Sequence, residues 1–203
     1  MKRCLREPID DIFVAADELA VASKALIEGD RLKAVALLNQ ANRPAIREWT
    51  ESLWGARSPY AIVVQRASRP TLATLVAERM PIKSQQAALI SRDGYHCRYC
   101  GIPLIRKEVR AHLSKLVPEA TLWGRTNLSQ HAAFQAMWLQ FDHVVPHSHG
   151  GDNSLDNIIV CCAPCNFAKM AFTVAELDLE DPRLREPKRS DWSGLEEILR
   201  VEA

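Results

Sequence analysis

Four of the six cysteines share the Cys-x-x-Cys spacing that is typical of metal sites: Cys97 with Cys100, and Cys162 with Cys165. Each such turn brings two thiolates together, and two turns can close a tetrahedral zinc site that has no open position. Burial as small apolar side chains explains two matched pairs poorly. The sequence therefore predicts a structural Zn²⁺ site. Cys161 lies in an apolar run and is expected to be a packed thiol, and Cys4 is isolated.

A polar stretch between the two cysteine pairs carries residues suited to hydrolytic chemistry. It reads FDHVVPHSHGGDNSLDN and contains the dipeptide Asp142-His143, followed by Asn157. Asn166 and Lys169 follow the second cysteine pair. A histidine has an ordinary pKa of about 6.5, which suits a general base at neutral pH. Neighbouring residues on a strand point to opposite sides, so one metal ligand and one non-ligand is a more natural division for Asp142 and His143 than two ligands.

These residues closely resemble the HNH endonucleases, and specifically those whose ββα-metal fold is braced by a zinc knuckle. The resemblance covers roughly residues 85–170 and includes the lead-in SRDGYHCRYCG. Its elements, in chain order, are Asp142-His143-x-x-Pro146, Gly150-Gly151, Asn157 and Cys162-x-x-Cys165-Asn166-x-x-Lys169. The resemblance does not reach the N-terminal helices.

The resemblance implies a role for each matching residue. Asp142 would be a ligand of a catalytic divalent cation and His143 the general base. Asn157 would hold the histidine or the strands by hydrogen bonds, and Asn166 would be the second cation ligand. Many members of the family have histidine where this chain has Asn166. An oxygen-only pair of ligands favours a hard cation, Mg²⁺ or Mn²⁺, over zinc.

The mechanism that the family implies is one-metal hydrolysis of a phosphodiester bond. His143 would activate water, while the cation on Asp142 and Asn166 stabilised the developing charge. Products would carry 5′-phosphate and 3′-hydroxyl ends. DNA is favoured over RNA because the family mostly cuts DNA, although nothing in the sequence distinguishes the sugar.

Other polar residues of the stretch have more than one interpretation. His147 and His149 could approach the metal or the phosphate, but surface-loop histidines are favoured. Lys169 could contact phosphate or could be an ordinary solvated lysine. His96, His112 and His131 are interpreted as structural or exposed. A set of aromatic residues at helix-like spacing favours a core position over base stacking: Trp123, Phe134 and Trp138.

The elements that must position these residues give an α+β fold, with an HNH core, a zinc knuckle, a helical insertion and an N-terminal helical region. Apolar spacing predicts a helix from about Asp10 to Glu28, a second over Arg31–Ala41 and a third from Pro44. Residues 56–70 predict one strand or a linker, and residues 72–92 a helix interrupted at Pro81. Two further helical patterns are RKEVRAHLSKLV and LSQHAAFQAMWLQ.

These elements suggest three regions. Residues 1–82 form a helical region that could contact a protein partner or a second copy, residues 83–170 the nuclease domain with its insertion at 104–140, and residues 171–203 an acidic tail. Lys and Arg outnumber Asp and Glu by nine to six in the middle region, whereas the tail has five against nine. This distribution is weak support for a nucleic-acid partner.

Composition excludes several classes of protein. The chain is 47% hydrophobic and 25% charged, which argues against a disordered tail. No apolar run approaches the roughly 20 residues of a membrane span, and the N-terminus does not resemble a secretory signal, so a cytoplasmic location is expected. The alternative function is a non-catalytic zinc module that binds nucleic acid. It gives no reason for the spacing of Asp142, His143, Asn157 and Asn166.

Overall fold

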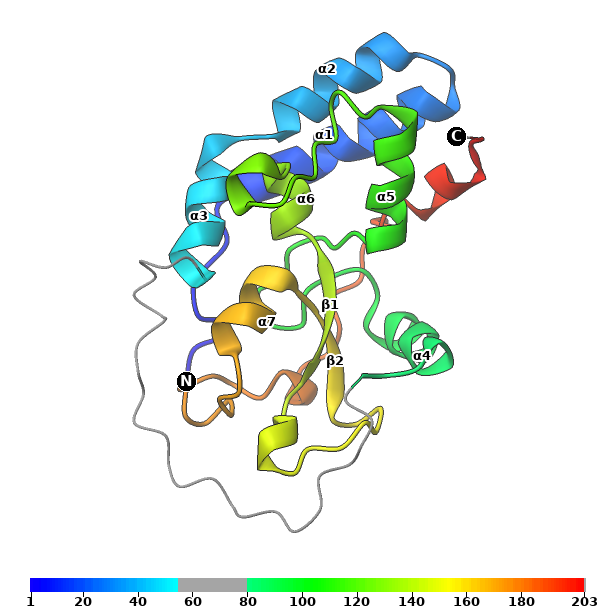
Figure 1. The fold of residues 1–203 in the computed structure, drawn as a ribbon. Helices are drawn as coiled ribbons and strands as arrows, with labels where there is room; N and C mark the ends of the chain where they lie inside the picture. The colour runs from blue at the N-terminus through cyan, green and yellow to red at the C-terminus, as the bar shows by residue number, and fades with distance from the viewer. Residues whose placement is uncertain (55–79, 203) are drawn as a thin grey trace.

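The computed structural model describes residues 1–54 and 80–202, and Figure 1 shows its fold. The helices are α1 (Asp10–Ile27), α2 (Arg31–Ala41), α3 (Pro44–Trp54), α4 (Lys83–Asp93), α5 (Lys107–Leu116), α6 (Ala132–Ala136) and α7 (Ala163–Lys169). The strands are β1 (Leu139–His143) and β2 (Ile158–Cys162). Short 3₁₀ turns are η1 (Asn127–Ser129), η2 (His147–His149), η3 (Pro182–Leu184) and η4 (Glu196–Arg200). This mixture of helices and a small sheet confirms the α+β class.

The first three helices lie where the sequence predicts them. Helices α1 and α2 form a hairpin across the top of Figure 1. Gly29 turns the chain between them with a φ of +83°, a value that side chains disfavour, and the Asp30 side chain accepts a hydrogen bond from the Lys33 amide (3.1 Å) to cap α2. Helices α1 and α3 pack against α6 of the insertion, so the N-terminal helices share a core with it.

The sheet is a pair of antiparallel strands in which Asp142 of β1 lies opposite Ile159 of β2. All five residues of β2 are buried, because α7 and α4 both contact this strand. Figure 1 shows α7 and α4 on opposite sides of the strand pair. The order strand, strand, helix therefore ends in α7, the element that carries Cys165 and Asn166.

One predicted helix is mostly wrong. Only Ala132–Ala136 of the pattern at 128–140 is helical, and β1 begins at Leu139. The helix ends at Ala136 because Ile105 pairs with the residues that follow. The Ile105 amide donates to the Met137 carbonyl (2.8 Å), and the Leu139 amide donates to the Ile105 carbonyl (3.0 Å). This pairing continues into the ladder with β2. The helix predicted by the pattern at 106–117 is confirmed as α5, which differs from it by one residue at each end.

Two predictions for the region before α4 fall outside the described residues, namely the strand or linker at 56–70 and the start of the helix at 72–79. The remainder of that helix is present as α4, which begins after Pro81. None of the helices in the described ranges has the length and apolarity that crossing a bilayer requires.

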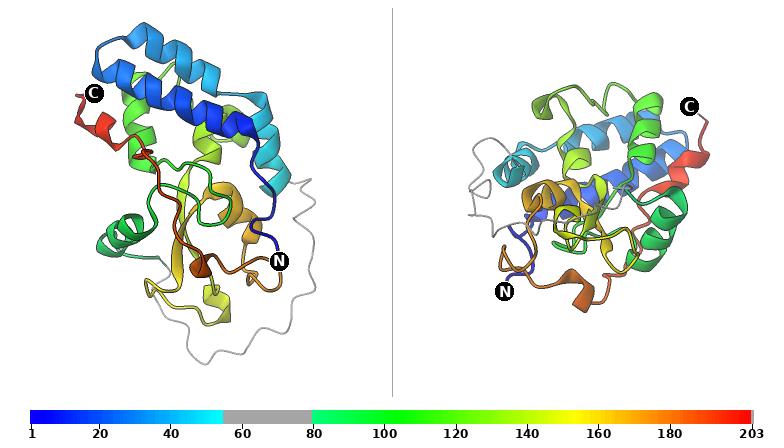
Figure 2. Two further views of the ribbon diagram at one scale, coloured as in Figure 1. Left: turned by 180° about the vertical axis from the view of Figure 1, so that it is seen from behind. Right: turned by 60° about the horizontal axis from the view of Figure 1, so that its bottom comes forward.

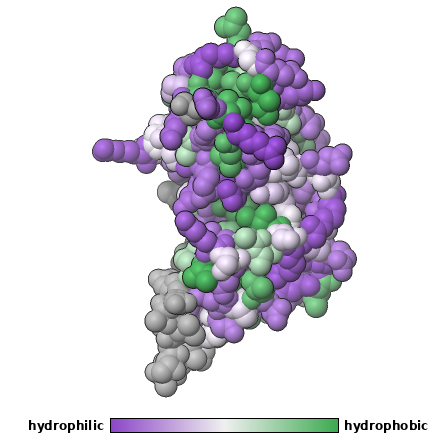
Figure 3. Space-filling model, turned by 90° about the vertical axis from the view of Figure 1, so that its right-hand side faces the viewer, coloured by the Kyte–Doolittle hydropathy of each residue, from purple (hydrophilic) through white to green (hydrophobic). Residues whose placement is uncertain are grey.

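The segment from 171 onward returns along the back of the molecule beside the first cysteine turn, as the rear view in Figure 2 shows. The Arg98 guanidinium donates to the carbonyls of Pro182 and Arg185. Near the end of the segment, Glu196 accepts one hydrogen bond from the Tyr95 hydroxyl (2.9 Å) and forms an ion pair with Arg106 (2.8 Å). The acidic segment therefore packs on the cysteine-bearing part of the chain. Figure 3 shows a largely hydrophilic face on which apolar side chains form small groups.

Candidate active site and metal centre

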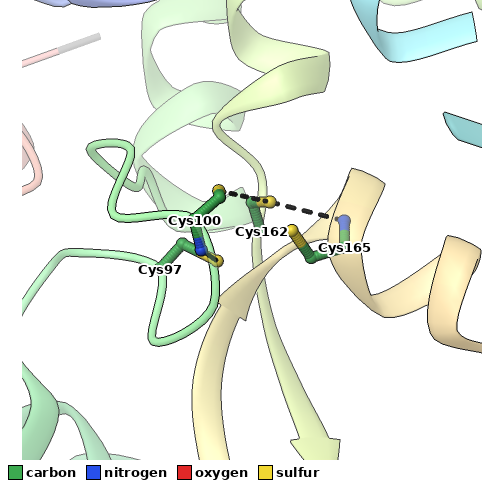
Figure 4. Close-up of side chains that lie close together, drawn as sticks. All are labelled: Cys97, Cys100, Cys162 and Cys165. Carbon is green, nitrogen blue, oxygen red and sulfur yellow. Dashed lines mark hydrogen bonds between the residues drawn. The ribbon is translucent and has the colours of Figure 1, made fainter. Parts of the chain in front are cut away.

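The four cysteines of the two predicted pairs meet in one buried cluster, shown in Figure 4. Their sulfur atoms all lie within 4.8 Å of one another. Cys97 and Cys100 come from the turn before Gly101, Cys162 ends β2, and Cys165 lies in the first turn of α7. Backbone amides support the sulfurs: Cys100 N donates to Cys97 Sγ (3.5 Å) and Cys165 N to Cys162 Sγ (3.4 Å).

The electrostatics of the cluster fit a metal ion. Burial raises the pKa of the Cys100 thiol, and it raises the pKa of Cys162 well above its ordinary value. Burial acts in the same direction at Cys97, but hydrogen bonds from the neighbouring thiols outweigh it and lower the pKa of Cys97. A dication compensates four crowded thiolates, and zinc is the usual ion for a closed four-sulfur site. The cluster is therefore compatible with Zn²⁺. Cys161 is fully buried but outside it, as a packed thiol would be.

Asp142 is buried at the centre of the polar residues, with 6% of its surface exposed. The Tyr99 hydroxyl donates to Asp142 Oδ2 (2.7 Å), and the Lys169 ammonium lies 3.1 Å from the same oxygen. Burial raises the pKa of Asp142, whereas the Lys169 charge and the Tyr99 hydrogen bond lower it. Lys169 also donates to the His143 carbonyl (2.8 Å), so it links the ends of β1 and α7.

His143 follows Asp142 on β1 and is held by a side chain from the loop between the strands. Its Nε2 lies 2.7 Å from Asn153 Oδ1. An amide oxygen can only accept, so Nε2 carries the proton in this arrangement and Nδ1 is left as the basic nitrogen. The loop is tied to α4, because Gln85 Nε2 donates to the Asn153 carbonyl (3.2 Å).

Asn157 fastens both ends of the same loop. Its Oδ1 accepts from the Val145 amide (2.9 Å), and its Nδ2 donates to the carbonyls of Val145 (3.1 Å) and Asp152 (2.9 Å). Gly151 is required at this place, since a Cβ there would lie 1.8 Å from the Val145 carbonyl oxygen. The loop that carries Asn153 is thus held in one conformation by hydrogen bonds.

A cleft of about 700 Å³ opens beside these residues. Three of the predicted site residues line it together: Asp142, His143 and Asn166. His147 also lines the cleft, while His149 does not belong to its wall. Lys169 does not line it either. Its side chain is 1% exposed and faces Asp142, so a contact with phosphate stays a prediction.

Sequence reasoning missed two residues of this arrangement, Tyr99 and Asn153. Tyr99 lies between the cysteines of the first turn. Because a shared zinc ion would bring the two cysteine turns together, the sequence could have indicated that Tyr99 lies near β1. Asn153 gave no signal beyond a polar residue in a Gly- and Asn-rich loop, because its contact with His143 depends on how the loop folds.

Fold and site together define an α+β protein with a four-cysteine cluster beside a cleft lined by a carboxylate, an imidazole and an amide. Residues 129–172 match the family model described as HNH endonuclease, which confirms the resemblance over that segment. Neither the curated proteins nor the solved structures yielded a match for the chain.

Proposed function

We propose that the protein is an HNH endonuclease that hydrolyses phosphodiester bonds in DNA with Mg²⁺ or Mn²⁺. One observation carries the proposal: Asp142, His143 and Asn166 line the same cleft, within the segment that matches the family. The ββα-metal assignment for β1, β2 and α7 and a cytoplasmic location belong to the same proposal. The family's substrates are nucleic acids, and DNA is its usual target.

The donor atoms of the cleft fit a hard cation. Asp142 offers a carboxylate and Asn166 an amide oxygen, the ligand types that Mg²⁺ prefers. Tyr99 and Lys169 occupy only part of the acceptor capacity of the carboxylate, which has about four lone-pair sites. When bound, the cation would stabilise negative charge on the phosphate and the leaving oxygen.

The protein's own residues supply the remaining functions. His143 Nδ1 would take a proton from the attacking water while Asn153 holds Nε2. Asn157 keeps the loop, and with it Asn153, in place. Lys169, which is buried and does not line the cleft, pairs with Asp142 and would limit the charge repulsion that an incoming phosphate meets.

Plasmid nicking in Mg²⁺ or Mn²⁺ tests the proposal, with His143→Ala as the decisive variant. Loss of a general base lowers a rate about 10²- to 10⁴-fold, and binding of DNA should persist. His149→Ala is the matched control, because it removes an imidazole from outside the cleft wall and should cleave at the wild-type rate.

Two outcomes contradict the proposal. Cleavage by His143→Ala at the wild-type rate would exclude His143 as the base. Binding of DNA without cleavage by the wild-type protein in either metal would favour the alternative, a non-catalytic zinc module that binds nucleic acid.

A further inference from the structure

A second pocket is lined in part by α7, the helix that also carries Asn166 of the candidate active site. It has a volume of about 280 Å³ and six lining residues: Trp54, Asn127, Gln130, Gln135, Trp138 and Phe167. Half of them are aromatic and half are amides, and none is charged. The Phe167 ring contacts both tryptophans, at centroid distances of 5.0 Å from Trp54 and 6.2 Å from Trp138.

The aromatic residues of this pocket are not core residues. Phe167 is 44% exposed, and Trp54 and Trp138 are half-buried. The sequence predicted core positions for Trp123, Phe134 and Trp138. Phe134 is 1% exposed and confirms this, whereas the two tryptophans are only half-buried. Trp123 adds a fourth ring to the contacts among Trp54, Phe167 and Trp138. It packs edge-on against Trp138 at a centroid distance of 5.8 Å and lies under the Arg110 guanidinium.

Two residues that line the pocket, Gln135 and Trp54, have unsatisfied hydrogen-bonding capacity. Gln135 is 1% exposed, and its Nε2 donates to Gln130 Oε1 (3.3 Å). Its Oε1 finds no partner among the described residues, and neither does Trp54 Nε1. A buried polar atom without a partner costs about 1–3 kcal/mol. Two of the residues that line the pocket therefore carry a polar group that the described part of the protein leaves unpaired.

The rim of the pocket is fixed before any ligand enters. Arg47 donates to the carbonyls of Asn127 and Gln130. The Asn127 side chain donates to Glu51 (2.9 Å), and the Gln130 amide donates to the Gly124 carbonyl (3.1 Å). Such anchoring lowers the entropic cost of binding, because the loop need not become ordered.

Helix α7 connects this pocket with the active-site cleft. Asn166 lines the cleft and Phe167, the next residue, lines the pocket, since successive helical residues point about 100° apart. A nucleic-acid strand that places a phosphate beside Asn166 can therefore place a base from a nearby nucleotide against Phe167.

We propose that this pocket binds an unpaired nucleobase of the substrate, so that the enzyme acts on DNA with a single-stranded segment next to the cleaved bond. Aromatic rings stack on every base, and side-chain amides pair with base edges. An uncharged lining suits a neutral base and leaves the phosphates outside. The inference rests on the proposed function and adds to it the class of DNA that is recognised.

Binding measurements on the full chain test the proposal without cleavage. In a His143→Ala background, fluorescence anisotropy compares three labelled DNAs: a blunt duplex, the same duplex with a short thymidine flank, and that flank with abasic nucleotides. The thymidine flank should strengthen binding roughly tenfold over the abasic flank, which is the size of one base–aromatic stack. Both flanks carry equal charge, so the difference reports the base alone.

Variants assign the effect to the pocket. Phe167→Ala should remove most of the tenfold preference, and Gln135→Leu should reduce it. Leu199→Ala is the control, because it shortens a side chain of similar exposure (37%) on η4, outside the pocket, and should keep the preference in full. Circular dichroism establishes that each variant folds. Phe167 is exposed, so Phe167→Ala removes no buried core side chain.

Equal binding of the two flanks, or an unchanged preference in Phe167→Ala, would overturn the pocket proposal. Either result leaves the proposed function intact if the wild-type protein nicks plasmid. Failure of the wild-type protein to bind or cleave any of these DNAs would overturn both.

Discussion

Lys169 and Asp142 form an ion pair that is almost completely removed from water. Their side chains are 1% and 7% exposed, and the carboxylate also accepts from Tyr99. Removing one member of a buried pair leaves the other charge without compensation, at a cost of about 3–5 kcal/mol.

Lys169→Met should therefore lower the free energy of unfolding by that amount in urea titrations. The double variant Asp142→Asn/Lys169→Met has no buried charge left at the pair, so its loss should be clearly smaller than the sum of the two single losses. Additive losses would mean that the pair is not coupled in solution.

Asn153 offers a second test at the level of one side chain, because it touches His143 and not the cleft. Asn153→Ala frees the imidazole and should reduce the cleavage rate about 10- to 100-fold through misorientation, with DNA affinity unchanged. Asn153→Asp keeps an acceptor for Nε2 and should restore most of the rate. Similar rates for the alanine and aspartate variants would show that the hydrogen bond does not position the base.

Among the elements, α2 and α6 are joined by a buried histidine. His131 Nε2 lies 2.8 Å from the Leu38 carbonyl of α2, and its Nδ1 accepts from the Phe134 amide of α6. The contact with Phe134 needs the neutral ring, because a protonated Nδ1 cannot accept, whereas the contact with Leu38 needs only the proton on Nε2. Burial lowers the pKa of His131 to about 4, against about 6.5 for an unfolded chain.

The lowered pKa of His131 makes this contact between α2 and α6 sensitive to acid. Below about pH 6.5 His131 is protonated in the unfolded chain but stays neutral in the folded chain. Its contribution to stability is therefore present above that pH and is lost as the pH falls toward 4. His131→Gln, which does not titrate, should be less stable than wild type at pH 7.5, and the gap should narrow toward pH 4.5. A gap of constant size in thermal melts would contradict the assignment.

The helices and strands could be predicted from the sequence only where residues within the element itself determine its bounds. The bounds of α1, α2 and α3 follow from Gly29, Asp30 and Pro44, which act within their own turns. The stretch around Trp138 could not be predicted in this way, because its conformation is decided by Ile105, more than thirty residues earlier. The same distinction holds for the site: the cysteine spacing predicts the cluster, while the contacts of Asn153 and Tyr99 need the folded loops.

For the whole molecule, the two kinds of metal site should respond differently to chelation. Four thiolates hold zinc far more tightly than a carboxylate and an amide hold magnesium, and structural zinc contributes to folding free energy. Mild EDTA should stop cleavage while zinc content and circular dichroism are kept, and Mg²⁺ or Mn²⁺ alone should restore activity.

Cysteine variants separate the cluster from ordinary packing. Cys97→Ser should lose zinc and lower the melting temperature, and added Mg²⁺ should not restore it. Cys161→Ala, a buried thiol outside the cluster, is the control and should retain one zinc per chain. Absence of zinc from wild-type protein purified under reducing conditions would reject the zinc knuckle.

The cluster also has a consequence for biosynthesis, because Cys100 and Cys162 are 62 positions apart. Helices α5 and α6 and strand β1 all lie between them, so the ribosome must release the whole insertion before the second cysteine pair can reach the first. Two early thiolates would hold zinc only loosely, and a zinc ion would be held by four thiolates only when β2 and the start of α7 have been made. We therefore expect zinc supply during translation to decide whether a new chain matures or is degraded, well before any nucleic acid is encountered.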